Sequence, residues 1–206
     1  MNVVDRVNGV IRKIPLWSVY LGSIVPFIWY ATLAVQNRLG ADPVKVLEHE
    51  FGLIALQLLV AALAVTPLRE LLRVNFLRLR RLMGQMAFVY AVLHVLVWAV
   101  LDRQLDWSAI IADLYKRPYI ILGAGAFLCL VPLAATSFDV AVRRMGGMAW
   151  RKLHRLAYPA TALAALHFLW LVKAWPPEPI MYCLIVGLLL VYRVFRGRIR
   201  NALRPV

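Results

Sequence analysis

The sequence has few charged residues and very few acidic ones. Only 17% of its 206 residues are charged, whereas 63% are hydrophobic and the mean hydropathy is +0.73. A soluble domain of this length is about half apolar, so the composition excludes an ordinary soluble globular domain. The apolar residues fall into separate runs long enough to cross a bilayer core, which indicates an integral membrane protein.

Cysteine is also scarce. Cys129 and Cys183 both lie inside apolar runs, and the sequence contains no CxxC motif or Cys/His cluster. Two isolated thiols exclude a disulfide framework and give no support to a zinc site. We do not expect a cleavable signal either, because no small-residue cleavage site follows the first apolar run. We therefore predict an uncleaved first span.

The shortage of acidic residues leaves a net charge of +14, from 24 Lys and Arg against 10 Asp and Glu. Nucleic-acid-binding proteins gather such charge in a patch on a folded surface. Here the basic residues lie in short segments between apolar runs, where membrane proteins keep their orientation signals. We therefore predict contact with membrane lipids and no nucleic-acid partner.

The apolar runs predict an all-α integral membrane protein, a bundle of six transmembrane helices. The predicted spans are roughly residues 16–35, 51–66, 82–101, 119–136, 150–172 and 180–195, the second being ended by Pro67. No segment outside the spans is long enough to fold alone, so residues 1–206 are predicted to form one transmembrane domain. No internal repeat is evident.

Basic residues lie mostly on one side of these spans. The N-terminal segment, the second-to-third loop, the fourth-to-fifth loop and the C-terminal tail together hold 18 of the 24 Lys and Arg, but only 3 of the 10 acidic residues. The positive-inside rule assigns that side to the cytoplasm. Both termini are therefore predicted to be cytoplasmic.

Two of the four histidines, His94 and His167, lie in different predicted spans at similar depth. His94 follows Arg81 at the same separation along the chain at which His167 follows His154, and the two spans run in the same direction. At about 1.5 Å per residue, each histidine lies roughly 20 Å from the cytoplasmic edge. Two neutral imidazoles facing each other can be the axial ligands of a six-coordinate haem iron. Such an iron has no open position for substrate, so the pattern predicts electron transfer.

The other two histidines leave alternatives open. The separation of His154 from His167 is about the spacing of two haems stacked across a membrane. At the depth of His154, however, the third span offers Arg80 and Arg81 and no histidine. The sequence thus predicts one complete haem site and one half-site, with an interfacial role as the alternative for His154. His49 is expected at the surface, or else at the edge of a quinone or partner site.

Four runs resemble a known family. They are, in this order, RRLMGQMAFVYAVLHVLVW, KRPYIILGAG, PLAATSFDVAVRRMGGMAWRKLHRLAY and LAALHFLW. Together they resemble the MsrQ family, formerly YedZ, which provides the haem-binding membrane subunit of a bacterial periplasmic methionine sulfoxide reductase system. The family belongs to the ferric-reductase-like transmembrane superfamily, and the resemblance extends from the second span to the sixth.

The resemblance implies haem b, held by His94, His154 and His167, and FMN as a second cofactor. It implies a multi-pass protein of the bacterial inner membrane that takes electrons from the quinone pool or a cytoplasmic flavin reductase. The implied partner is MsrP, a periplasmic molybdopterin enzyme that repairs oxidised methionines in proteins. This sequence shows neither the flavin and nicotinamide domain of the related NADPH oxidases nor a molybdopterin domain. We therefore expect an electron-transfer subunit with an external donor, and not the catalytic subunit.

Cationic and aromatic residues of two cytoplasmic loops are predicted to gather around His154. They are Arg80, Arg81, Trp150, Arg151 and Arg155. Arginine binds phosphate bidentately, so an anionic cofactor such as FMN would find partners there. A relay at His154, whether FMN, a quinone headgroup or a second haem, would divide the distance that electrons cross from the cytoplasmic side to the haem at His94 and His167. Ordinary positive-inside charge with bound lipid is the competing interpretation.

Other functions remain as alternatives. A b561-like quinol cytochrome serving another periplasmic acceptor would share the haem chemistry. A non-haem transporter would need polar residues or broken helices near mid-membrane, and the spans have few such groups apart from the histidines. An assembly protein would not need two histidines at equal depth. A visible spectrum of the purified protein separates the haem proteins from the other two.

Overall fold

The computed structural model describes residues 3–172 and 176–202, and the ordered structure within them is entirely helical. Five of the helical segments described are long and apolar enough to cross a membrane. They are α2 (Leu16–Val35), α3 (Pro43–Leu71), α4 (Leu77–Leu96) with its π-helical continuation η1 (Val97–Asp102), α6 (Pro118–Ala135) and α10 (Pro177–Ala202). This agrees with the prediction of an all-α membrane protein.

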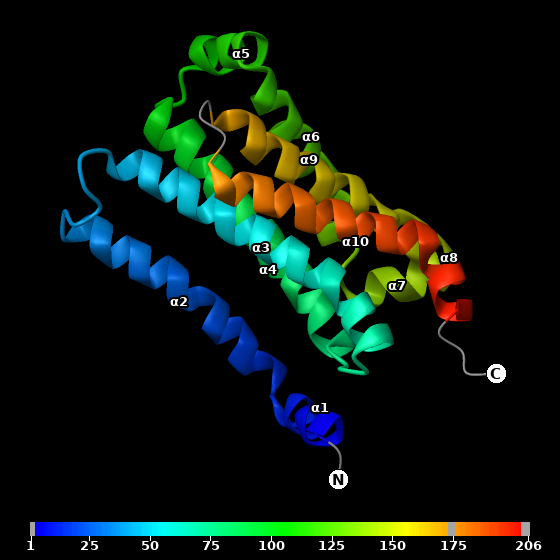
Figure 1. The fold of residues 1–206 in the computed structure, drawn as a ribbon. Coiled ribbons are helices and arrows are strands. Elements are labelled where there is room, and N and C mark those ends of the chain that lie inside the picture. Colours follow the sequence, from blue (N-terminus) through cyan, green and yellow to red (C-terminus); the bar gives the residue numbers. More distant parts are fainter. Residues whose placement is uncertain (1–2, 173–175, 203–206) are drawn as a thin grey trace.

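The long helices are arranged as a bundle with one helix beside it. α9 (Ala157–Leu171) packs against both α6 and α10, and α3 packs along α4, while α2 runs next to this bundle (Figure 1). The short helix α5 (Trp107–Lys116) covers one end. The other short helices, α1 (Val3–Lys13), α7 (Asp139–Met145) and α8 (Gly147–Leu153), lie at the opposite end together with both chain termini.

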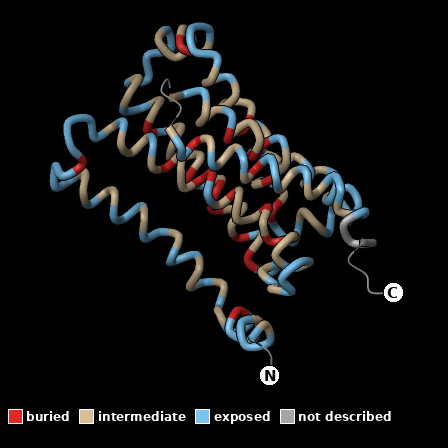
Figure 2. Tube along the Cα trace, viewed as in Figure 1, coloured by how far each residue is buried: buried red, intermediate tan, exposed pale blue. Residues whose placement is uncertain are grey.

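The core lies where α3, α4, α6 and α9 meet, and buried residues gather inside the bundle (Figure 2). Leu59 and Leu130 are buried there, and Ala87 and Ala160 are completely inaccessible. Small residues let helix backbones approach closely within a membrane. Each alanine stands about two helical turns before a histidine of the predicted haem pair. The two alanines therefore let α4 and α9 each pack closely against their neighbouring helices, two turns before the histidines.

α3 continues through Pro67 to Leu71, so the prediction that the second span ends at Pro67 was wrong. Proline has no N–H and leaves the carbonyl four residues earlier without its helical partner. That carbonyl belongs to Leu63. The guanidinium of Arg193, on α10, donates to it and to the hydroxyl of Thr66. A neighbouring helix thus supplies the missing donor, which is how prolines are tolerated within membrane helices.

The fifth predicted span, residues 150–172, is not one continuous α-helix. α8 ends at Leu153, a 3-10 turn, η2, covers His154–Leu156, and α9 then begins at Ala157. Pro159 explains the break, because in an unbroken helix its ring would clash with the carbonyl of Arg155. Pro159 stands in the first turn of α9 instead, where proline is tolerated. His154 and His167 therefore do not share one regular helix.

Candidate functional site

A cavity of about 550 Å³ lies between α3, α4, α6 and α9, toward the end of the bundle that carries α5. Most of its lining is apolar, which is typical of cofactor sites. His94 lines it from α4 and His167 from α9. The structure thus brings together the two histidines that the depth count from the sequence paired.

The imidazole rings of His94 and His167 face each other across this cavity. Their centroids are 6.1 Å apart and their planes are 81° apart. With a metal–nitrogen bond of about 2 Å and a ring centre about 1 Å behind the nitrogen, two imidazoles on opposite sides of one metal have centres about 6 Å apart. The observed spacing therefore fits a single metal ion held axially between the rings.

Each ring is fixed through its Nδ1 atom. Nδ1 of His94 lies 2.7 Å from the carbonyl oxygen of Glu48, and Nδ1 of His167 lies 2.7 Å from that of Tyr119. A carbonyl oxygen only accepts, so Nδ1 carries a proton in both rings and Nε2 is the nitrogen left to bind a metal. Metal-binding histidines have the same arrangement, with the second ring nitrogen donating to a carbonyl or carboxylate.

Two glycines make room for the rings. A Cβ atom at Gly52 would lie 2.9 Å from Nδ1 of His94, and one at Gly123 would lie 2.9 Å from Nδ1 of His167. Such contacts are too close for carbon and nitrogen. The sequence analysis missed both glycines and the carbonyls of Glu48 and Tyr119. The signal that could have found them is a glycine inside an apolar helix, one turn after a polar residue.

The two halves of the site repeat one local arrangement. Glu48 and Gly52 on α3 correspond to Tyr119 and Gly123 on α6, and each pair has the glycine one helical turn after the residue whose carbonyl accepts. In both halves a buried alanine also stands about two turns before the opposed histidine. The pair α3–α4 and the pair α6–α9 are therefore built on the same local plan. The sequence analysis found no internal repeat, because few residue types recur outside these positions.

The donor set favours a cofactor-borne metal. Among the described residues, no group of three or more His, Cys, Asp or Glu side chains could hold a metal ion. Two opposed imidazoles suit a metal whose equatorial ligands come with a macrocycle, and the apolar walls suit the body of that macrocycle. Haem b fits the residues that are present. His49, expected at the surface, also lines this cavity and lies 5.6 Å, between ring centroids, from Phe168.

At the other end of the bundle, His154 stacks on Trp150, with ring centroids 3.9 Å apart and planes 26° apart. Thr136 anchors both rings: its hydroxyl lies 3.1 Å from Nε2 of His154, and its carbonyl accepts from Nε1 of Trp150 at 2.9 Å. His154 therefore differs from the opposed pair, because its Nε2 atom is the engaged one. To bind iron through Nε2 it would have to give up the contact with Thr136.

Arg80 and Arg81 lie near enough to His154 for their charges to act on it. Arg81 also donates to the carbonyl of Ser137 and pairs with the carboxylate of Asp139. This guanidinium lowers the pKa of Asp139 below its ordinary value. Arg81 thus ties the start of α4 to the connection between α6 and α7, beside the stacked rings.

Arg151 and Arg155, the other predicted members of this cluster, stay at the surface. The guanidinium of Arg151 reaches back to within 3.3 Å of the position that a Cβ on Gly147 would occupy, so it lies along its own helix. Arg155 is exposed. Of the predicted set, the structure brings Trp150, Arg80 and Arg81 to His154 and leaves these two arginines at the edge.

Comparison with known proteins gives a family. Residues 49–165 match the family described as the ferric reductase like transmembrane component. This range includes His94 and His154 and ends just before His167.

Proteins from Brucella ovis, Brucella canis and Brucella suis are each 46% identical to this chain over 193 residues. The match covers 92% of this chain and 87% of each relative. All three are named protein-methionine-sulfoxide reductase heme-binding subunit MsrQ.

Proposed function

Because the chain belongs to the MsrQ family of ferric-reductase-like membrane proteins, we propose that it is a haem b subunit that delivers electrons to a methionine sulfoxide reductase. The Brucella relatives carry the name of a haem-binding subunit of such an enzyme. In this proposal the chain moves electrons across the membrane, and the reduction of the sulfoxide takes place on the partner.

One observation carries the proposal: His94 and His167 oppose each other across an apolar cavity, and each ring is locked through Nδ1. These two histidines would hold the haem iron from opposite faces. Haem b bound in this way supplies one-electron chemistry without an open coordination position. The chain's own residues hold both imidazoles with Nδ1 as the donor, which leaves Nε2 for the metal, and the apolar lining of the cavity limits the access of water.

We propose six spans, with both termini on the cytoplasmic side of a bacterial inner membrane and residues 1–206 forming one transmembrane domain. The span that is added to the five long helices would be α9, fifth along the chain, whose 15 residues cover about 22 Å and are extended by the turn at His154. The excess of basic residues at the end that carries both termini supports this orientation. The cavity then lies nearest the periplasm.

The proposed acceptor is MsrP, a periplasmic molybdopterin subunit that repairs oxidised methionines in periplasmic proteins. The names of the relatives support a methionine sulfoxide reductase as the partner. The proposed donor is the quinone pool or a cytoplasmic flavin reductase. The cavity near α5 would face the acceptor, and the stacked rings of His154 and Trp150 would face the donor.

We further propose that electrons enter near His154. The stacked imidazole and indole offer an aromatic face, and Arg80 and Arg81 offer cationic partners to an anionic group. FMN would use both features, through its ring system and its phosphate. A quinone headgroup would use the aromatic face alone. A second haem would need His154 as a ligand and therefore the loss of its contact with Thr136.

The second candidate is a b561-like quinol cytochrome that serves another periplasmic acceptor, since the opposed histidines would suit it equally well. A non-haem transporter or assembly protein accounts for neither the two carbonyl locks nor the two glycines that fit the rings.

The visible spectrum of the purified protein tests the haem proposal. We expect a Soret band and a sharp reduced α-band, with haem and flavin quantified in the same sample. A colourless preparation from cells that make ample haem would contradict it. Oxidation of the reduced protein by purified MsrP with a methionine sulfoxide substrate separates the two cytochrome candidates. A reduced cytochrome that MsrP leaves reduced would favour the b561-like alternative.

A further inference from the structure

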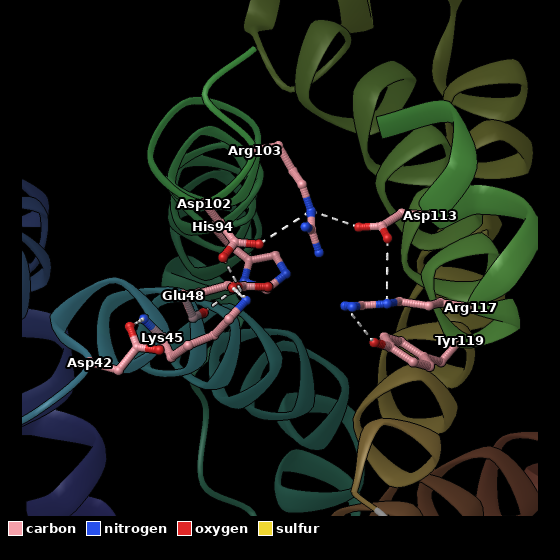
Figure 3. A network of polar contacts seen from close by, with 9 residues as sticks. All are labelled: Asp42, Lys45, Glu48, His94, Asp102, Arg103, Asp113, Arg117 and Tyr119. Carbon is pink, nitrogen blue, oxygen red and sulfur yellow. Dashed lines mark hydrogen bonds and ion pairs between the residues drawn. The ribbon is translucent and has the colours of Figure 1, made fainter. Parts of the chain in front are cut away.

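The cavity between His94 and His167 has a mostly apolar lining, with two cations and the carboxylate of Glu48 at one end. Among the described residues that line it, Lys45 and Arg117 are the cations. Lys45 stands in the first turn of α3, and Arg117 directly precedes α6. Both lie at the end of the cavity beside α5 (Figure 3).

Each half of the site contributes one of these cations. Lys45 stands about one turn before Glu48 on α3, and Arg117 stands just before Tyr119 at the start of α6. Glu48 and Tyr119 are the residues whose carbonyls lock the two opposed imidazoles. Each half of the site therefore has a cation shortly before its carbonyl residue, although the two cations do not stand at the same register.

Both cations are held in place by neighbouring groups. Lys45 pairs with Glu48 at 2.8 Å and with Asp102 at 3.0 Å. Arg117 pairs with Asp113 at 3.4 Å and donates to the hydroxyl of Tyr119 at 3.4 Å. An ammonium group has three donors and a guanidinium five, more than these contacts use. The two side chains are 48% and 43% exposed, so each can take a further acceptor without losing its anchor.

A third cation, Arg103, ties the two anchors together. Its Nε atom lies 3.3 Å from Asp102 and 2.7 Å from Asp113, so it stands between the carboxylate that holds Lys45 and the one that holds Arg117 (Figure 3). Arg103 is not among the residues that line the cavity. Arg103 therefore holds Asp102 and Asp113 at a fixed separation from outside the cavity. Lys45 and Arg117, which do line the cavity, stay available for a ligand.

We propose that Lys45 and Arg117 bind the two propionate groups of the haem, one each. This inference rests on the proposed haem site between His94 and His167. Haem carries its two carboxylates on one edge of the ring, and the cavity carries its two cations at one end. The reverse orientation would bury both carboxylates among apolar residues such as Leu59, Leu130 and Ala164, which is costly without partners. The carboxylate edge of the haem therefore faces the α5 end.

Haem and its dimethyl ester, in which both propionates are methylated, are the probes that test the proposal. Each is titrated into the full-length protein produced in haem-depleted cells. We expect the wild type to bind haem more tightly than the ester by about tenfold or more, as charge-assisted hydrogen bonds at half-exposed sites would give. Lys45→Met and Arg117→Met should each reduce this ratio, and the double variant should bring it close to one.

Lys116→Met is the matched control, because Lys116 is an exposed cation next to Arg117 that does not line the cavity. It should keep the wild-type ratio. Both ligands are measured on the same variant, so a general loss of folding cancels from the ratio. The redox midpoint potential is a second readout, and it should fall in each cavity variant because an unpaired propionate favours the ferric state.

The outcomes distinguish the two levels of the proposal. Equal affinity for haem and ester in the wild type, both with a low-spin spectrum, would overturn the propionate assignment and leave the histidine pair intact. A wild-type preference that survives in the double variant would also overturn it. The lack of a low-spin spectrum with either ligand would contradict the haem site itself.

Discussion

A Cβ atom on Gly52 would lie 2.9 Å from Nδ1 of His94. The same nitrogen donates to the carbonyl of Glu48, one turn earlier on the same helix. The ring is therefore pressed against the backbone of α3 and can move away only by breaking its hydrogen bond. Gly123 and His167 have the same relationship on α6, so the position of both imidazoles depends on glycine.

We predict that Gly52→Ala and Gly123→Ala each lower the haem content of the purified protein severalfold. Alanine normally stabilises a helix over glycine by roughly 0.5–1 kcal/mol, but here the methyl group displaces the ligand ring. Gly84→Ala is the control, since a Cβ there meets nothing within 4 Å. Full haem content in all three variants would show that the close approach has no bearing on the site.

We predict that Arg103→Met destabilises the end of the protein that carries α5 by about 1–3 kcal/mol, because it leaves two largely buried carboxylates without their shared cation. Asp102 and Asp113 have side chains that are 17% and 11% exposed. Unfolding in a denaturing detergent measures the change, with the exposed Arg38→Met as control. Adding Asp113→Asn should restore part of the loss. A variant as stable as the control would show that Arg103 does not hold this network.

We predict that both termini are cytoplasmic, from the distribution of basic residues. A C-terminal green fluorescent protein should fluoresce, and a C-terminal alkaline phosphatase should be inactive. The same reporters fused after Gln104, between η1 and α5, should behave in the opposite way. The reverse pattern would turn the cavity toward the cytoplasm and away from a periplasmic acceptor.

The sequence was sufficient for the long helices and for the pairing of His94 with His167. Apolar length marks a membrane helix directly, and counting residues from Arg81 and from His154 placed the two histidines at equal depth. That depth count tolerated the break at His154, because a short 3-10 turn changes the rise by only a few ångströms.

The rest of the site depends on contacts between helices that no local pattern encodes. In the sequence alone, Pro67 indicates the end of a helix. The helix continues because Arg193 of α10 donates to the Leu63 carbonyl that the proline leaves without a partner. Arg151 and Arg155 were predicted to join the cluster at His154, but their directions depend on where α8 ends, and Pro159 sets that. From the sequence, Lys45 and Arg117 are only basic residues outside the four basic segments, because it is the fold that brings them to one end of the cavity.

We predict that His154→Ala leaves the haem between His94 and His167 largely intact but slows its reduction by the physiological donor. His154 stacks on Trp150 at the far end of the bundle, so its loss interrupts the proposed path without touching the site between His94 and His167. Stopped-flow reduction by quinol or by a flavin reductase measures the rate. Wild-type rates with unchanged haem and flavin content would return His154 to an interfacial role.

The most direct test replaces the two opposed histidines in a His154→Ala background, where any haem bound at His154 no longer contributes. Low-spin haem b is then quantified by visible and electron paramagnetic resonance spectroscopy. His49→Ala is the matched control, because His49 lines the same cavity but its ring packs against Phe168 and is not one of the opposed pair. We predict that His94→Ala and His167→Ala each abolish the low-spin signal and that His49→Ala retains it. A wild-type low-spin signal in either His94→Ala or His167→Ala would contradict the assignment of the axial pair.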